Sequence, residues 1–133
     1  MNQSDDNGRI VAIRGAVVDV AIFLILLGCL LTAWLQTALV DPGTTPLEWH
    51  QAIARSDAAV RQRYQLCPKT QRYRPPRSHF DSVSRRVVLN MDHFCPWVVN
   101  TVGFYNRKFF LLFLFYACVT IAYSLLAIAA QVR

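Results

Sequence analysis

Residues 21–40 read AIFLILLGCLLTAWLQTALV, and residues 109–130 read FFLLFLFYACVTIAYSLLAIAA. Each run is long enough to cross a hydrocarbon core of roughly 30 Å at about 1.5 Å per helical residue. The second run carries no charged side chain, and the first, extended back to Ala16, carries a single acid, Asp19. The first run is too long for the apolar core of a cleaved signal peptide, which spans about 7 to 15 residues. The pattern predicts two transmembrane helices, over residues 16–40 and 109–130.

The chain outside these two runs is polar and basic. Of 133 residues, 54% are apolar and 17% charged, which excludes a disordered tail and leaves room for one compact unit. The segment 41–108 holds 11 of the 14 Lys and Arg but only 5 of the 8 acids, so it accounts for the net charge of +6. The expected fold class is an all-α membrane protein: a tail (1–15), a helix, a water-facing basic loop (41–108), a second helix and an end (131–133).

Within the loop, Asp41-Pro42-Gly43 has the chemistry of a turn that ends the first helix. Thr45 followed by Pro46 and Glu48 predicts the start of a short helix that runs to about Gln65. Its apolar stripe either lies on the membrane surface or covers the rest of the loop. The remainder is predicted to be mostly irregular, with small hairpins. The stripe consists of Trp49, Ile53, Val60 and Tyr64.

The orientation of the loop depends on the basic residues near the helix ends. Arg107 and Lys108 favour a cytoplasmic loop, whereas Arg9 and Arg14 favour the opposite side. We expect a cytoplasmic loop, because its basic residues are many and because a reduced thiol belongs in that compartment. The expected location is an endomembrane or the plasma membrane, as a multi-pass protein.

Cys95 is the candidate nucleophile, because it lies in the sequence Met91-Asp92-His93-Phe94-Cys95-Pro96-Trp97. A thiol attacks only as the thiolate, and a nearby imidazole and positive charges favour that form. His93 is the candidate base, and Asp92 can orient the imidazole and stabilise the imidazolium. Only 13 residues separate Cys95 from Phe109, so the thiol stays near the membrane surface.

A substrate that is half lipid and half polyanion suits such a site. Acyl-coenzyme A is one, because its chain can lie in the bilayer while its phosphates meet Arg and Lys side chains. The same basic residues can instead attract anionic lipid, at roughly 1 kcal/mol each. The candidate phosphate contacts are Arg74, Arg77, Arg85, Arg86, Arg107 and Lys108.

Three motifs carry a family resemblance: RPPRSH (74–79), VLNMDHFCPW (88–97) and NTVGFYN (100–106). Together they closely resemble the cysteine-rich domain of DHHC-type protein S-acyltransferases. Asp41-Pro42-Gly43 matches the family's Asp-Pro-Gly turn, and the two apolar runs match its second and third spans. The resemblance implies transfer of a long acyl chain, usually palmitoyl, from acyl-CoA through an acyl-enzyme on Cys95 to cysteines of membrane-associated proteins. Asn100, Gly103 and Asn106 are expected to shape the turn into the membrane.

The resemblance fails at the positions where the family binds two zinc ions. Phe94 replaces the second His of the four-letter motif, and only Cys67 remains of the eight ligands. Four N or S ligands are needed for structural zinc, so we expect no metal cofactor. One hypothesis is that an apolar cluster of Phe80, Val87 and Phe94 replaces the metal centres, and the rival is a member that has lost metals and activity. The first set of ligand positions consists of Cys67, Thr70, Phe80 and Val87, and the second set consists of Asp81, Ser84, Phe94 and Thr101.

The resemblance also implies more chain than is present, because family members have at least four spans and a Thr-Thr-x-Glu element. The expectation is a fragment, a groove completed by another chain, or an inactive form. The competing class is a non-catalytic membrane protein whose basic loop binds anionic lipid or a protein partner. The expected partners are the membrane, acyl-CoA and proteins with cytoplasmic cysteines. A nucleic-acid role is not expected, since no binding motif occurs.

Overall fold

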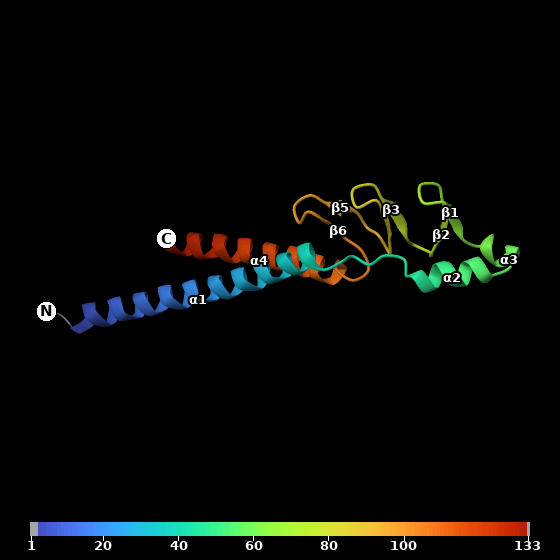
Figure 1. Cartoon of the computed structure of the whole chain (residues 1–133). Coiled ribbons are helices and arrows are strands. Elements are labelled where there is room, and N and C mark those ends of the chain that lie inside the picture. Colours follow the sequence, from blue (N-terminus) through green and yellow to red (C-terminus); the bar gives the residue numbers. More distant parts are fainter. Residues whose placement is uncertain (1–2, 133) are drawn as a thin grey trace. The chain divides into compact units, whose positions relative to one another are not determined.

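The computed structural model describes residues 3–132, and two long helices dominate it (Figure 1). Helix α1 covers Gln3–Leu39 and α4 covers Arg107–Gln131. The segments Arg14–Leu39 and Arg107–Gln131 are long and apolar enough to cross a membrane. Large apolar side chains such as Ile25, Leu126 and Ile128 remain exposed on them, as expected for side chains that face lipid. The prediction of two long apolar helices is confirmed.

The chain divides into two compact units. One holds the chain up to Ala33 and from Leu111 onward, and in it Tyr123 donates a hydrogen bond of 2.8 Å to Oδ1 of Asp19. The other holds Trp34–Phe110 and contains the loop. The bounds of α1 place part of the segment predicted as an N-terminal tail (1–15) in helical backbone.

The loop contains two short helices and three two-stranded antiparallel hairpins. The predicted helix to Gln65 is interrupted, because it ends at Arg55 and a new turn begins at Ala58. Pro46 rather than Thr45 occupies the N-cap, and no side chain caps this end. Figure 1 shows the hairpins following one another along the chain. The elements are α2 (Leu47–Arg55), α3 (Ala58–Arg61), β1 (Gln65–Cys67), β2 (Arg72–Arg74), β3 (His79–Asp81), β4 (Arg86–Val88), β5 (Phe94–Cys95) and β6 (Asn100–Thr101).

Each hairpin turn contains a residue in the left-handed region. These are Gln71 (φ 54°), Arg85 (φ 54°) and Val99 (φ 52°). A left-handed residue lets a short chain reverse direction, although side chains with a Cβ rarely adopt it. The prediction of a mostly irregular loop with small hairpins is confirmed.

The Asp41–Thr44 segment follows α1 and is hydrogen-bonded to Leu89, just after β4, and to Tyr105, beyond β6. Gly43 has φ 97° and donates to the Asp41 carboxylate at 2.7 Å, while its carbonyl accepts from Leu89 at 2.9 Å. Gly103 approaches this segment so closely that an added Cβ would lie 2.7 Å from the Pro42 carbonyl oxygen. A side chain is therefore excluded at residue 103 without movement of the backbone.

Three of the four residues of the apolar stripe, Trp49, Ile53 and Tyr64, pack within the loop. Ile53 is buried, and the rings of Trp49 and Tyr64 meet edge to face with centroids 4.9 Å apart. Nε1 of Trp49 also donates to the Tyr73 carbonyl at 3.3 Å. Of the two alternatives that the sequence left open for these residues, the structure therefore has the inward-facing one. Val60 is exposed.

Candidate active site

The segment that holds Asp92 and His93 is fixed to the chain around Val102 by two backbone hydrogen bonds. Asp92 N donates to the Val102 carbonyl at 2.9 Å, and Val102 N donates to the His93 carbonyl at 2.8 Å. Val102 is fully buried, so this ladder is anchored in the core of the loop. Cys95 follows in β5, opposite Asn100 of β6. The three residues of the predicted catalytic group therefore lie on one short stretch of ordered backbone.

Asp92 lies between a histidine and an arginine. Its Oδ1 is 3.8 Å from Nδ1 of His93, and its Oδ2 is 3.8 Å from Nη2 of Arg107. Both distances are ion-pair distances and are too long for hydrogen bonds. The imidazole of His93 also meets the ring of Phe110 edge to face, with centroids 5.2 Å apart. The imidazole therefore lies between the Asp92 carboxylate and the Phe110 ring.

The Cys95 thiol is the buried member of the group. Cys95 is 5% exposed, whereas Asp92 and His93 are exposed to solvent. Among the described residues, no hydrogen bond joins this thiol to the imidazole. Catalytic hydrogen bonds are commonly long before substrate binds, so this geometry is compatible with a nucleophile and base pair. The neighbouring Trp97 is 81% exposed and presents an apolar ring beside the thiol's hairpin.

Two asparagines tie this hairpin to the end of α1. Nδ2 of Asn100 lies 3.0–3.1 Å from the carbonyls of Thr37, Ala38 and Val40. Nδ2 of the fully buried Asn106 donates to the Thr101 carbonyl at 2.9 Å, and its Oδ1 accepts from Gly103 at 2.8 Å. The last carbonyls of a helix have no partner within it, and these amides supply partners. The expected structural role of these asparagines agrees with the contacts.

The six basic residues predicted to meet phosphate fall into two groups. Three have acceptors within the loop: Arg74 donates to the Ser78 carbonyl at 2.8 Å, Arg86 to Asp41 at 2.8 Å, and Arg107 lies beside Asp92. The other three, Arg77, Arg85 and Lys108, form no ion pair within residues 3–132, and all three are exposed.

Arg77 lines two of the loop's cavities. One, of about 360 Å³, includes Arg74 and His79, and the other, of about 320 Å³, includes Asn90 and Phe104. Arg77 itself has φ 62°, so its backbone turns sharply between them. It is therefore the best placed of the predicted phosphate contacts to meet an anionic ligand.

The second set of former zinc positions forms a hydrogen-bonded cluster. Oδ2 of Asp81 accepts from the hydroxyls of Ser84 and Thr101, each at 2.6 Å, and from Ser84 N at 3.0 Å. Oδ1 accepts from Val83 N at 3.1 Å. Burial raises the pKa of Asp81, but these hydrogen bonds outweigh burial and hold the pKa below its usual value. We call Asp81, Ser84 and Thr101 the carboxylate cluster.

This cluster was not predicted from the sequence. The apolar residues hypothesised to replace the metals, Phe80, Val87 and Phe94, are only half-buried, with Phe80 opposite Val87 in the β3–β4 pair. An Asp followed by a turn is typical of a side chain that accepts from backbone amides two and three residues on. That local signal at Asp81 was present in the sequence.

The first set of former zinc positions keeps one thiol. Cys67 is 2% exposed. Burial raises the pKa of Cys67, but hydrogen bonds around residues 69–70 and the charge on Arg74 lower it by more.

Neither set fits zinc as a donor group. Structural zinc needs four N or S ligands, whereas the second set offers one carboxylate, two hydroxyls and a phenyl ring. Within the described residues, no three His, Cys, Asp or Glu side chains gather in a way that could hold a metal ion.

Comparisons with known proteins support the family resemblance that the three motifs indicate. Residues 60–132 match the family described as DHHC palmitoyltransferase. The chain is 39% identical over 132 residues to "Probable protein S-acyltransferase 13" of Arabidopsis thaliana, which covers 85% of this chain and 43% of that protein. It is 33% identical over 121 residues to "Palmitoyltransferase ZDHHC7" of Mus musculus, which covers 87% of this chain and 38% of that protein. The chain thus spans about two fifths of the length of these curated relatives.

Proposed function

Since the chain belongs to the DHHC palmitoyltransferase family, we propose that it carries the catalytic loop of a protein S-acyltransferase. Cys95 is the nucleophile, His93 the base and Asp92 the group that orients the base. The acyl donor is acyl-CoA, and the acceptor is a cysteine of a membrane-associated protein. The observation that carries this proposal is the ordered stretch from Asp92 to Cys95, in which the carboxylate lies 3.8 Å from the imidazole.

The reaction proceeds in two thioester exchanges. His93 removes the proton from the Cys95 thiol, and the sulfur attacks the thioester carbonyl of acyl-CoA. The bond to the CoA sulfur breaks, CoA leaves with the proton as a thiol, and Cys95 holds the acyl group. In the second exchange the thiol of the acceptor cysteine gives up its proton and attacks this new thioester. The acyl group moves to the acceptor, and the Cys95 thiol is restored.

The carboxylate of Asp92 contributes by favouring the charged form of His93. An imidazole that has taken a proton becomes positive, and a neighbouring negative charge stabilises that state. Arg107 lies on the other side of Asp92, with its Nη2 3.8 Å from Oδ2 of the carboxylate. His93 directly precedes β5 and Cys95 ends it, so the base and the thiol are two residues apart along the chain. This spacing supports proton transfer between them.

We assign contact with the CoA phosphates to Arg77, Arg85 and Lys108. Arg77 and Arg85 make no ion pair within residues 3–132, and the Lys108 ammonium lies over the Phe109 ring at 4.7 Å with no carboxylate partner in that range. Arg74, Arg86 and Arg107 instead hold parts of the loop together. The same cation excess favours a cytoplasmic loop between two membrane-spanning helices.

The test is acyl-enzyme formation by the full chain in detergent micelles with a clickable fatty-acyl-CoA. We expect a label that hydroxylamine removes and that is lost in Cys95→Ser. Cys67→Ser is the matched control, because it removes the other loop thiol, which is 2% exposed. Equal labelling of the wild type and Cys95→Ser contradicts the assignment. A wild type that takes no label but binds anionic vesicles favours the non-catalytic alternative.

We further propose that the loop folds without zinc, held by the carboxylate cluster and the asparagine contacts. Support comes from the donor chemistry of the former ligand positions and from the three hydrogen bonds that converge on Oδ2 of Asp81. Purified protein should contain less than stoichiometric zinc by elemental analysis, and a chelator should leave its melting temperature unchanged. One bound zinc per chain contradicts this.

A further inference from the structure

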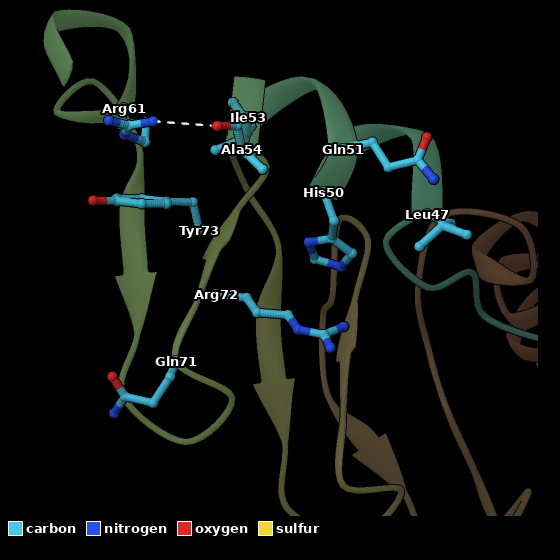
Figure 2. A pocket seen from close by; sticks show the side chains of 9 residues that line it. All are labelled: Leu47, His50, Gln51, Ile53, Ala54, Arg61, Gln71, Arg72 and Tyr73. Atoms are coloured by element: carbon cyan, nitrogen blue, oxygen red, sulfur yellow. Dashed lines mark hydrogen bonds between the residues drawn. The ribbon is translucent and has the colours of Figure 1, made fainter. Parts of the chain in front are cut away.

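A cleft of about 450 Å³ lies among α2, α3 and the β1–β2 hairpin (Figure 2). Its apolar lining comes from Leu47, Ile53, Ala54 and Tyr73, and Gln51 and Gln71 add amide groups. None of the residues of the proposed catalytic group lines it, and neither do the six predicted phosphate contacts. A cavity of this size with a largely apolar lining and a few polar groups is typical of a ligand site.

The charged groups around the cleft have one sign. The ionisable nitrogen groups that line it belong to His50, Arg61 and Arg72, and no carboxylate lines it. The guanidinium of Arg61 is already hydrogen-bonded within the loop, because it donates to the carbonyls of Ala54 at 3.4 Å and Ser56 at 2.7 Å. Arg72 makes no ion pair among residues 3–132. In Figure 2 its guanidinium and the imidazole of His50 extend into the same space.

Protonation of His50 is disfavoured in the cleft. Burial and the positive charge on Arg72 lower the pKa of His50, so the imidazole is largely neutral near pH 7. Arg72 of β2 is the cation that acts on His50, and Arg61 of α3 is a second cation that lines the same cleft. An entering carboxylate would offset these charges and favour protonation of His50.

Contacts outside the cleft fix its walls before any ligand enters. Trp49 holds α2 to β2 through its bond to the Tyr73 carbonyl at 3.3 Å. The hairpin turn is closed by Gln71, whose backbone N donates to the Cys67 carbonyl at 2.8 Å and whose side chain donates to the Pro68 carbonyl at 2.8 Å. A preformed site avoids much of the entropic cost of ordering on binding.

We infer that this cleft docks a short acidic and apolar segment of the protein substrate, an inference that rests on the proposed acyltransferase function. A carboxylate of the segment pairs with Arg72 and His50, and an aliphatic side chain packs against Leu47 and Ile53. A guanidinium and a carboxylate form charge-assisted hydrogen bonds, which are stronger than neutral ones. The lining suits both parts of such a segment, because basic groups and aliphatic side chains border the same cleft.

Docking at this cleft would select substrates. A protein attached here as well as by its own membrane anchor meets the acyl-enzyme at a raised effective concentration. The cleft would therefore affect the second thioester exchange and leave the first unchanged.

The test uses the full chain in micelles and a fluorescein-labelled peptide in which Glu and Leu alternate. Binding is followed by fluorescence anisotropy. Arg72→Gln should weaken binding about tenfold, which corresponds to about 1.4 kcal/mol. Arg55→Gln is the matched control, because Arg55 ends α2 outside the cleft, and it should bind like the wild type. Leu47→Asp should also weaken binding, and an acid in the first turn of a helix is compatible with folding.

Several results overturn the inference. Equal affinity of the wild type and Arg72→Gln does so, as does equal binding of a peptide in which Lys replaces Glu. Displacement of the Glu–Leu peptide by CoA or by phosphatidylserine vesicles would assign the cleft to those ligands instead. Acyl labelling of Cys95 is measured on the same samples. Intact labelling with unselective peptide binding contradicts the cleft alone, and selective binding with no labelling contradicts the catalytic proposal alone.

Discussion

Asp81 is a buried carboxylate whose charge is stabilised by hydroxyl and amide donors. It is 2% exposed, and its folded-state pKa is lowered. Because the folded pKa lies below the unfolded value of about 3.9, its stabilisation is fully present above that value. The stabilisation is lost as the pH falls through the folded pKa.

We predict that Asp81→Asn lowers the free energy of unfolding by about 2 kcal/mol near neutral pH, since hydrogen bonds to a charged group contribute roughly 1.5–3 kcal/mol. The deficit should shrink below about pH 4, where the wild type also loses the charge. Melting followed by tryptophan fluorescence at several pH values measures this. Asp41 has a lowered pKa as well, so the comparison is repeated in an Asp41→Asn background. A deficit that does not change with pH would show that the charge of Asp81 has no part in it.

His93 is exposed and packs only edge-on against Phe110, so its removal should disturb the fold little. His93→Ala is expected to slow acyl-enzyme formation by about 10²–10⁴-fold, the usual contribution of a general base. Added imidazole should restore part of the rate, because a free base can enter the gap. His50→Ala serves as the control and should keep the wild-type rate of this first exchange, because His50 lines the cleft at α2 and no residue of the proposed catalytic group does. A His93→Ala variant that imidazole does not rescue would assign the residue a structural role.

At the scale of elements, the two asparagines connect the β5–β6 hairpin to the last carbonyls of α1. Asn106→Asp replaces an amide donor by a negative charge beside the Thr37 and Val40 carbonyls, which lie at 3.3 and 3.4 Å. Carbonyl groups at a helix C-terminus repel an anion. Burial of an unpaired group costs about 1–3 kcal/mol, and more when it is charged.

We therefore predict that Asn106→Asp lowers the melting temperature sharply and makes the loop sensitive to limited proteolysis. Asn90→Asp is the matched control, because it makes the same chemical change at a half-buried turn residue whose carbonyl accepts from Arg107 at 3.4 Å. Comparable losses in the two variants would mean that the helix-end contact has no special importance.

The sequence could predict elements whose cause is local. Residues 109–130 have a continuous apolar composition that permits only a helix in lipid, and Asp41-Pro42-Gly43 contains its own turn chemistry. The interruption of the short helix near Ser56 could not be predicted from periodicity, since Ser56 folds back to donate to the Ile53 carbonyl at 2.8 Å.

The long-range contact within the carboxylate cluster could not be predicted from the sequence pattern either. Asp81 and Thr101 are far apart in sequence and meet only through the hairpins that carry them. The cleft at Arg72 depends in the same way on how α2 packs against β2. Residue types at single positions therefore predicted the loss of zinc ligands but not the interactions that replaced them.

At the scale of the whole molecule, hydrogen bonds to Asp81 join positions at which the resemblance to the family implies a zinc site. If the backbone still brings the four residues of the second set together as a zinc site requires, then only the side chains differ from a zinc site and the hairpins keep its geometry. Ser84 and Thr101 already lie within 2.6 Å of one oxygen of Asp81, and Phe94 is the cross-strand partner of Thr101.

We predict that combining Asp81→Cys, Ser84→Cys, Phe94→His and Thr101→Cys creates a zinc site in the otherwise unchanged chain. The variant should bind one zinc by elemental analysis and melt higher with zinc than after chelation, because metal binding to a folded site adds to the free energy of folding. The same set with Phe94 retained is the control, since three ligands leave the tetrahedron open. Failure of the four-fold variant to bind zinc would mean that the hairpins have moved away from the metal geometry. The carboxylate cluster would then belong to a rearranged loop.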